Sequence, residues 1–322
     1  MKQMPKISVI FPVYNVAEYL EQSLRSILEQ AYKNIEIIAI NDGSTDNSLA
    51  ILETIAQQDT RIKVYSQNNQ GVAKTRMNAL VKCTGEYVCF VDSDDIIPYD
   101  GFTVLVHRIV ADNADIVIGA YIEKTNAKEV TKEVAKVAIM DVESSLDIVL
   151  KQEVSNALWA KLFRLQLFKH VELVEYKVGE DRILLIQAIS KSTRVSFIND
   201  VTYIYIVREN SASGKYKYSN VYLLHIYEAA YWVYCYINKM VPDFPEYKND
   251  MFLYRFYIDL VSKGGAYLIT AKQRSYMENV FHKIRKKLTK RALLWHFLIK
   301  NEYLYKIGLL VAKFRLKLKR NR

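Results

Sequence analysis

The sequence has few cysteines, and those present follow no disulfide or metal-binding pattern. Cys83, Cys89 and Cys235 occur in 322 residues without CxxC spacing, and an odd number cannot all pair within one chain. This argues against a disulfide scaffold and against a Cys-rich zinc site. The five histidines show neither HExxH nor clustered spacing, so a histidine-based metal centre is not expected either.

Several nucleotide and hydrolase motifs are also missing. There is no GxGxxG after the first apolar run, no GxxxxGK[ST] and no GxSxG, which argues against a dinucleotide site, a P-loop and a hydrolase elbow. No run reaches the ~18 apolar residues that a membrane-spanning helix needs. The N-terminal stretch breaks at Pro12 and Asn15 before it could form a signal peptide. With an apolar fraction of 51%, the chain is expected to be a cytoplasmic globular protein.

The positive charge is concentrated at the C-terminal end. Of the net charge of +10, residues 283–322 carry +13, from 14 Lys or Arg and one acid, which leaves −3 for the first 282 residues. Apolar residues in this tail recur at helical spacing, for example Leu294, Phe297 and Leu298. A basic amphipathic helix suits an anionic membrane surface. The alternative is a helix packed on the body with a solvated basic face. The charge would also attract nucleic acid, but the chain has no base-reading motif, so no nucleic acid is expected as a partner.

The first third alternates strands and helices. The apolar pattern predicts strands at Ile7–Val13, Ile35–Ile40, Ile62–Tyr65 and Tyr87–Val91, with helices over 17–30, 47–58 and Val72–Val81 between them. Such alternation with short connections predicts an α/β fold, with a mostly parallel sheet flanked by helices.

Polar residues cluster where these strands end. The strands are followed by Pro12-Val13-Tyr14-Asn15, by Asn41-Asp42-Gly43-Ser44-Thr45-Asp46 and by Asp92-Ser93-Asp94-Asp95. Ligands of open α/β sheets bind at the carboxyl ends of the strands. Although these are also ordinary turn residues, their coincidence on one rim indicates a site.

Asp92 and Asp94 offer hard oxygen ligands directly after a buried strand. Oxygen ligands without His or Cys favour Mg²⁺ or Mn²⁺, which bind through few carboxylates plus substrate phosphates. Asp42, on a neighbouring strand end, is suited to accept from a base or a ribose hydroxyl. Arg76 is suited to pair with phosphate or to orient the acids, and a structural ion pair is an equally good interpretation.

At this point the sequence resembles a known family. ISVIFPVYN, INDGSTDNS, NNQGVAKTRMNAL and GEYVCFVDSDD resemble the consecutive motifs of family 2 glycosyltransferases of the GT-A fold, over about residues 5–120. Trp159-Ala-Lys-Leu-Phe163 and Gly179-Glu180-Asp181 resemble motifs of bacterial members that build capsule, exopolysaccharide and other surface glycans. Tyr203-Ile-Tyr-Ile-Val-Arg208, with Ser211 and Ser213, resembles a later segment. Thr75-Arg76-Met77-Asn78 departs from the usual A-R-N, which leaves the contact of Arg76 less certain.

The resemblance implies an inverting, metal-dependent transfer from a UDP-sugar to a hydroxyl of a lipid-linked or protein-linked glycan. It implies that Pro12, Tyr14 and Asn15 line the uridine pocket and that Asp42 contacts uracil or ribose. It places Asp92 and Ser93 at the nucleotide, Asp94 (with Asp92) at Mn²⁺ or Mg²⁺, and Asp95 near the donor sugar. It makes Asp181 the catalytic base, whereas the residues alone favour helix capping by Glu180 and Asp181.

The second half is helical and rich in Tyr. We expect a GT-A catalytic domain over 1–215, with nucleotide-sugar binding in about 1–120 and acceptor and base residues in about 121–215. A helical C-terminal subdomain over 216–322 would follow, with peripheral membrane contact through 283–322 at the inner face of the cell membrane. A non-catalytic nucleotide- or glycan-binding subunit that scaffolds a partner transferase is the alternative function. The oligomeric state is left open, with a homodimer as one option.

Overall fold

The chain folds into two compact units, which are described here one at a time. The computed structural model describes residues 4–134, 136–172, 174, 178–208, 220–301 and 304–310. The first unit is Met1–Glu175 with Glu180–Ser211, and the second is Tyr176–Gly179 with Ala212–Arg322. Ser211, Ser213 and the end of the predicted basic tail, 311–322, lie outside the described residues.

The first unit begins with the predicted strand and helix alternation. Its elements are β1 (Ile7–Val13), α1 (Ala17–Leu28), β2 (Ile35–Asp42), α2 (Ser48–Ala56), β3 (Ile62–Gln67), α3 (Val72–Leu80) and β4 (Tyr87–Phe90). These four strands are parallel to one another, in the order β3-β2-β1-β4. Every residue of β2 is buried, as expected for a strand covered on both faces. The α/β prediction is confirmed for this part.

The sheet then continues with mixed pairing. The further elements are α4 (Gly101–Ala111), β5 (Ile116–Lys124), β6 (Glu129–Lys132), β7 (Ala138–Met140), α5 (Val142–Lys151), β8 (Lys161–Arg164), η1 (Leu165–Phe168), α6 (Glu180–Lys191) and β9 (Val195–Ile206). The order is β3-β2-β1-β4-β8-β5-β9-β7, with β6 on β5. The short β8 lies antiparallel between β4 and β5. Residues far apart in sequence are therefore neighbours in the middle of the sheet.

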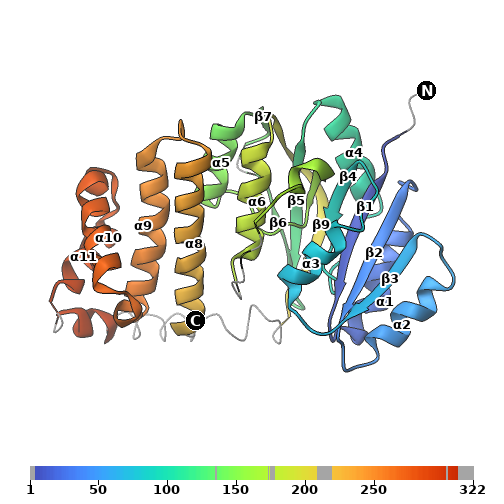
Figure 1. The fold of residues 1–322 in the computed structure, drawn as a ribbon, viewed down its shortest axis with the longest axis horizontal. Helices are drawn as coiled ribbons and strands as arrows, with labels where there is room; N and C mark the ends of the chain where they lie inside the picture. The colour runs from blue at the N-terminus through green and yellow to red at the C-terminus, as the bar shows by residue number, and fades with distance from the viewer. Residues whose placement is uncertain are drawn as a thin grey trace. The chain divides into compact units, whose positions relative to one another are not determined.

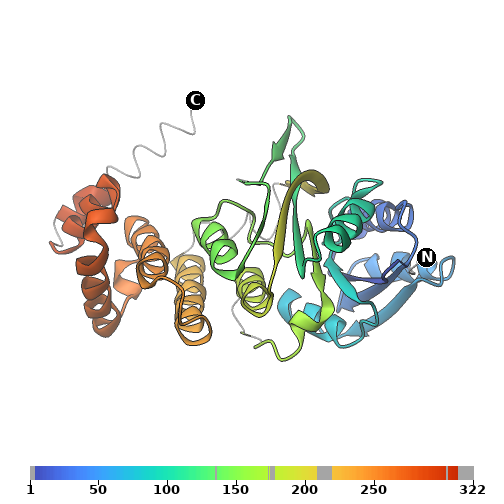
Figure 2. The same cartoon turned by 90° about the horizontal axis from the view of Figure 1, so that it is seen from above.

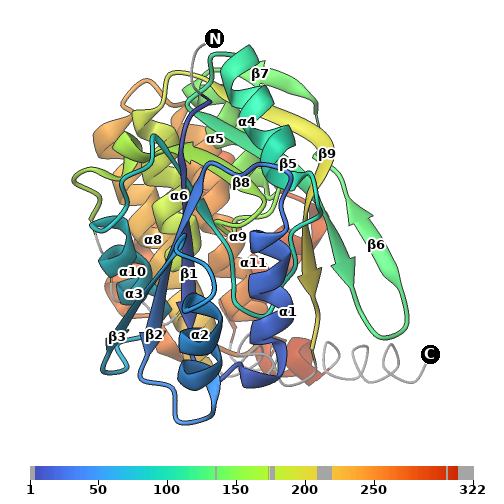
Figure 3. The ribbon, with the colours of Figure 1, turned by 90° about the vertical axis from the view of Figure 1, so that its right-hand side faces the viewer.

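Helices cover both faces of this sheet. Leu20 and Leu24 of α1, Leu52 of α2 and Phe102 of α4 share one buried cluster with the same face of β1, β2 and β4. Helices α3 and α6 lie on the opposite face (Figures 2 and 3). Phe90, Phe163 and Phe168 pack edge to face in the core. The carboxyl ends of β1, β2 and β4 are thereby held by a rigid, fully packed layer.

The second unit is a set of helices (Figure 1). They are α8 (Asn220–Met240), α9 (Glu246–Ser262), η2 (Ala266–Leu268), α10 (Ala271–Ile284), η3 (Arg285–Lys287) and α11 (Lys290–Ile299), and residues 304–310 are also helical. The loop at Pro242–Pro245 separates α8 from α9. Tyr227, Tyr254 and Tyr257 are buried, so these aromatic side chains form core packing between helices. None of the helices in the described part of the chain is long and apolar enough to span a membrane.

Candidate active site

The end of β1 carries the exposed Tyr14 ring and Asn15, which is held by hydrogen bonds to the loop after β2. Tyr14 is 48% exposed, Pro12 is half-buried, and Asn15 has a φ of 50°, a left-handed conformation that Asn tolerates. The Asn15 Oδ1 accepts from the Thr45 N–H at 2.7 Å, and its own N–H donates to the Ser44 Oγ at 3.2 Å. The loops after β1 and β2 therefore support each other, which leaves the Tyr14 ring free at the edge of the sheet.

Asp42, at the end of β2, is buried and bonded to the protein. Its Oδ1 accepts from the Gln67 Nε2 at 2.8 Å and the Gln70 N–H at 2.9 Å, while its Oδ2 accepts from the Gly71 N–H at 2.9 Å. Gly71 has a φ of 82°, which a residue with a Cβ rarely adopts. Asp42 thus holds the loop that starts α3, and its predicted contact with the nucleotide stays a prediction.

Arg76 of α3 is the centre of the site. It is 3% exposed, and its Nη2 lies 2.8 Å from the Asp92 Oδ1. Its Nη1 lies 2.5 Å from the Asp181 Oδ1 and 3.5 Å from the Glu180 Oε1. These contacts agree with an arginine that orients the acids and equally with a structural ion pair, and its predicted contact with phosphate stays a prediction. It brings Asp92, from the end of β4, and Asp181, at the start of α6, onto one guanidinium, although they are far apart in the chain.

The two acids of α6 sit in its first turn, where the helix dipole favours negative charge. Burial raises the pKa of Asp181, while the Arg76 charge opposes that rise, the charge of Asp92 adds to it, and the Leu158 N–H and the Lys161 charge also oppose it. Burial and the Asp181 charge raise the pKa of Glu180 to about 7, against the pull of Arg76. Desolvation by burial is the leading cause of the raised pKa in both groups, so both carboxylates bind a proton more readily than exposed acids do.

The last two acids of the segment after β4, Asp94 and Asp95, contact different partners. Asp94 pairs through its Oδ2 with Arg208, whose guanidinium lies 4.2 Å from the centre of the Tyr19 ring. Asp95 is 1% exposed, and its oxygens accept from the Tyr203 hydroxyl and the Ile206 N–H, each at 2.8 Å.

Asp95 therefore lies beneath the rim and not on it. Burial, with the charge of Asp92, raises its pKa to about 8. Ser93 is also buried. The Tyr203 hydroxyl in turn accepts from the Asp92 N–H at 3.1 Å, so Asp95 fixes the loop that presents Asp92 and Asp94. A contact of Asp95 with the donor sugar stays a prediction.

Two participants were missed by the sequence interpretation. Tyr203 and Arg208 belong to a segment quoted for its resemblance, yet no role was assigned to either residue. The signal was the Y-x-Y-x-x-R spacing itself, because residues two apart on a strand share one face. Tyr203 and Tyr205 accordingly both stack on the Trp159 ring system, with centroids 4.9 and 5.5 Å away.

Asp92 and Asp94 are the candidate ligands for Mn²⁺ or Mg²⁺. No cluster of three or more His, Cys, Asp or Glu in the described ranges is arranged to hold a metal. Asp92 and Asp94 supply two carboxylates without His or Cys, and both are partly accessible. This donor set fits a hard cation that takes its remaining ligands from substrate phosphates and water. It does not form a cage made of protein alone.

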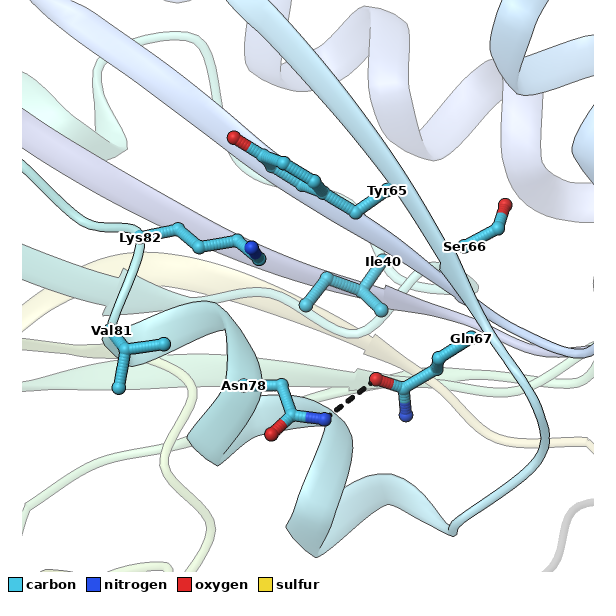
Figure 4. Close-up of a pocket in the computed structure, with 7 residues that line it drawn as sticks. All are labelled: Ile40, Tyr65, Ser66, Gln67, Asn78, Val81 and Lys82. Atoms are coloured by element: carbon cyan, nitrogen blue, oxygen red, sulfur yellow. Dashed lines mark hydrogen bonds between the residues drawn. The ribbon is translucent and has the colours of Figure 1, made fainter.

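A separate hollow of about 310 Å³ lies between β3 and α3. Its walls are Ile40, Tyr65, Ser66, Gln67, Asn78, Val81 and Lys82, and the Asn78 Nδ2 donates to the Gln67 Oε1 (Figure 4). None of the predicted site residues lines this hollow, so it is separate from the site formed by Asp92, Asp94 and Asp181. It is nevertheless adjacent to two predicted site residues, because Gln67 also bonds Asp42 and Ile40 lies opposite Pro12 in the sheet.

The fold is the GT-A fold. TarS of Staphylococcus aureus, solved with UDP-GlcNAc, superposes with a TM-score of 0.71 at 23% identity, over 96% of this chain and 91% of that one, which shows the fold. The family model for glycosyl transferase family 2 matches residues 8–155.

Curated relatives agree with that match. The glycosyltransferase GlyG of Streptococcus pneumoniae is 32% identical over 217 residues, 64% of this chain and 72% of that protein. GlyA of the same species is 36% identical over 218 residues, 65% of this chain but only 31% of that protein. The chain belongs to glycosyl transferase family 2. It spans about a third of the length of GlyA.

Removal of the Arg76 charge is expected to lower the free energy of unfolding by an amount that depends on pH. In Arg76→Met, three largely buried carboxylates lose their cation, so unfolding free energy at pH 8 is expected to fall by about 3–5 kcal/mol. At pH 5 the loss is expected to be smaller, because carboxylates with raised pKa values protonate and need no partner. Urea unfolding at both pH values measures this. The control Arg25→Met, in an exposed pair with Glu21, is expected to stay within about 0.5 kcal/mol. An equal loss at both pH values would contradict the charge account.

Proposed function

We propose that the protein is an inverting, metal-dependent glycosyltransferase that moves a sugar from a UDP-sugar to a hydroxyl of a lipid-linked or protein-linked glycan in bacterial surface-glycan synthesis. The observation that carries the proposal is the convergence of Asp92 and Asp181 on the buried Arg76. The likeness of the fold to a structure solved with UDP-GlcNAc supports the choice of donor.

In this proposal Asp181 is the base. The acceptor hydroxyl gives its proton to the Asp181 carboxylate as its oxygen bonds to the anomeric carbon, and the bond from that carbon to the diphosphate breaks. The raised pKa of Asp181, caused first by burial, makes it a stronger base than an ordinary aspartate. Arg76 and the Leu158 N–H hold the carboxylate in place. One base and no protein nucleophile are sufficient for inversion.

The leaving diphosphate needs positive charge. Asp92 and Asp94 would hold a Mn²⁺ or Mg²⁺, which supplies that charge without proton transfer when bound. Arg208, next to Asp94, provides a second cation at the same place. Tyr14, Pro12 and Asn15 at the end of β1 would receive the uridine, since the exposed Tyr14 ring offers a stacking surface.

The direct test is donor-specific release of UDP. With Mn²⁺ and a panel of UDP-sugars, one donor is expected to release UDP, and EDTA is expected to abolish that release. Asp94→Asn is expected to weaken both turnover and donor binding. The matched control Asp259→Asn changes an exposed acid of α9. If no donor is turned over with any acceptor and UDP does not bind, the proposal is wrong; UDP binding without turnover would favour the scaffold subunit.

Asp181→Asn separates chemistry from binding. Loss of the base is expected to lower kcat by about 10²–10⁴-fold and to leave the affinity for UDP unchanged, since asparagine keeps the shape of the side chain. Steady-state UDP release and calorimetric titration with UDP measure the two effects. Because protonation of the base stops turnover, wild-type kcat/KM is expected to fall on acidification at a pH above the usual aspartate range. Full activity of the variant would remove Asp181 from the chemistry.

The helical unit supports a peripheral contact with an anionic membrane. Trp295 and His296 are the buried side of α11, whereas Leu294 and Phe297 are 54% and 62% exposed. Lys290 and Arg291 of the same helix are exposed and make no ion pair among the described contacts. Exposed apolar side chains beside unpaired cations match the boundary between lipid headgroups and acyl chains. In this proposal the enzyme works at the inner face of the cell membrane.

Vesicle flotation tests this contact without any catalysis. The wild type is expected to float with phosphatidylcholine vesicles that contain phosphatidylglycerol, and not with pure phosphatidylcholine. Leu294→Glu with Phe297→Glu is expected to weaken binding at least about tenfold, since it removes apolar area and adds like charge. The control Tyr99→Glu with Val110→Glu adds the same charge at exposed apolar positions of the first unit. Equal flotation of both double variants would exclude α11 as the contact.

A further inference from the structure

Lys161 is a lysine in the middle of the sheet. It begins β8, which lies between β4 and β5, and it is 1% exposed. Within the described part of the chain no carboxylate lies within ion-pair distance of its Nζ. Burying an ammonium group without an ionic partner is costly. The contacts that Lys161 makes as a hydrogen-bond donor are expected to offset that cost.

The Lys161 ammonium holds a tight bend. Its Nζ donates to the Ala157 carbonyl at 2.7 Å and to the Trp159 carbonyl at 3.3 Å. The bend ends at Ala160, whose φ of 57° is left-handed and whose carbonyl accepts from the Gly119 N–H at 2.9 Å. A left-handed alanine persists only where its surroundings impose it. Lys161 supplies part of that constraint by satisfying two carbonyls on the inside of the bend.

The same bend touches the base. The Leu158 N–H, between the two carbonyls that Lys161 binds, lies near the Asp181 carboxylate and lowers its pKa. The charges near Asp181 include those of Arg76 and Lys161, which favour its ionised form, and those of Asp92 and Glu180, which oppose it. Burial lowers the pKa of Lys161 to about 7, against the charges of Asp181 and Cys89.

We propose that Lys161 is a positioning residue, which shapes the 157–160 bend so that the Leu158 N–H points at the Asp181 carboxylate. The inference rests on the proposed function, since it assigns Asp181 as the base. In this proposal two elements hold the Asp181 carboxylate. Arg76 holds it from the side of α3, and the bend that Lys161 shapes holds it from the side of β8. A site with only the first support would let the carboxylate turn away from the acceptor hydroxyl.

The test substitutes Lys161 and reads kcat separately from KM. Lys161→Met keeps the length of the side chain but cannot donate, so kcat is expected to fall about 10²-fold, as misplaced catalytic groups do, with the donor KM unchanged. Lys161→Gln, which still donates a hydrogen bond, is expected to lose less. It also keeps the proposal testable if the methionine variant does not fold. The control Phe163→Leu opens a cavity two residues further along β8 and is expected to leave kcat unchanged.

Hydrogen exchange gives a readout that needs no activity. The Leu158 amide is expected to exchange at least tenfold faster in Lys161→Met than in the wild type, and at the wild-type rate in Phe163→Leu. An unchanged kcat in folded Lys161→Met, a kcat loss equal to that of Phe163→Leu, or unchanged Leu158 exchange would each overturn the proposal. If the wild type turns over no donor, the proposed function fails, while the exchange rate still decides whether Lys161 shapes the bend.

Discussion

The structure of the site depends on one buried guanidinium. Arg76 is almost fully enclosed and contacts three carboxylates that come from two separate segments. Without it, acids in this partly buried space would repel one another, and burial would favour their protonated forms. With it, the Arg76 charge opposes the effect of burial on Asp181 and Glu180. In the proposed function, this structural ion pair also orients the catalytic acid.

The topology explains why this contact can form at all. β4 carries Asp92 at its end, and the short antiparallel β8 lies directly beside β4. The bend that precedes β8 therefore reaches the first turn of α6, where Asp181 lies. An extra strand inserted against the direction of its neighbours brings a loop to the carboxyl edge that a purely parallel sheet would direct elsewhere. In the proposed function, the base is therefore supported by a strand that carries none of the other predicted site residues.

The elements of the first third follow directly from the sequence. Runs such as Ile35–Ile40 are apolar at every position except Glu36 because both faces of the sheet are covered, and the polar residues at the sheet edge follow from where such strands end. Asp181 is different. Local pattern assigns it only to the start of a helix, and its approach to Arg76 depends on pairing across about a hundred residues. Only the resemblance to the family pointed to it.

The residues whose surroundings could not be predicted are those fixed by β9. Asp94 and Asp95 are adjacent acids, equally polar and equally suited to a turn, and the sequence placed both at the ligand. The structure separates them because the Tyr203 hydroxyl and the Ile206 N–H, both from β9, enclose Asp95, while Arg208 pairs with Asp94 at the surface. The segment 203–208 therefore holds the loop after β4 on its buried side, through Asp95, and pairs with the charge of Asp94 through Arg208. Asp95, a buried acid with a raised pKa, accepts from the Tyr203 hydroxyl, which in turn accepts from the Asp92 N–H. In this way Asp95 fixes the position of Asp92, the acid that Arg76 binds.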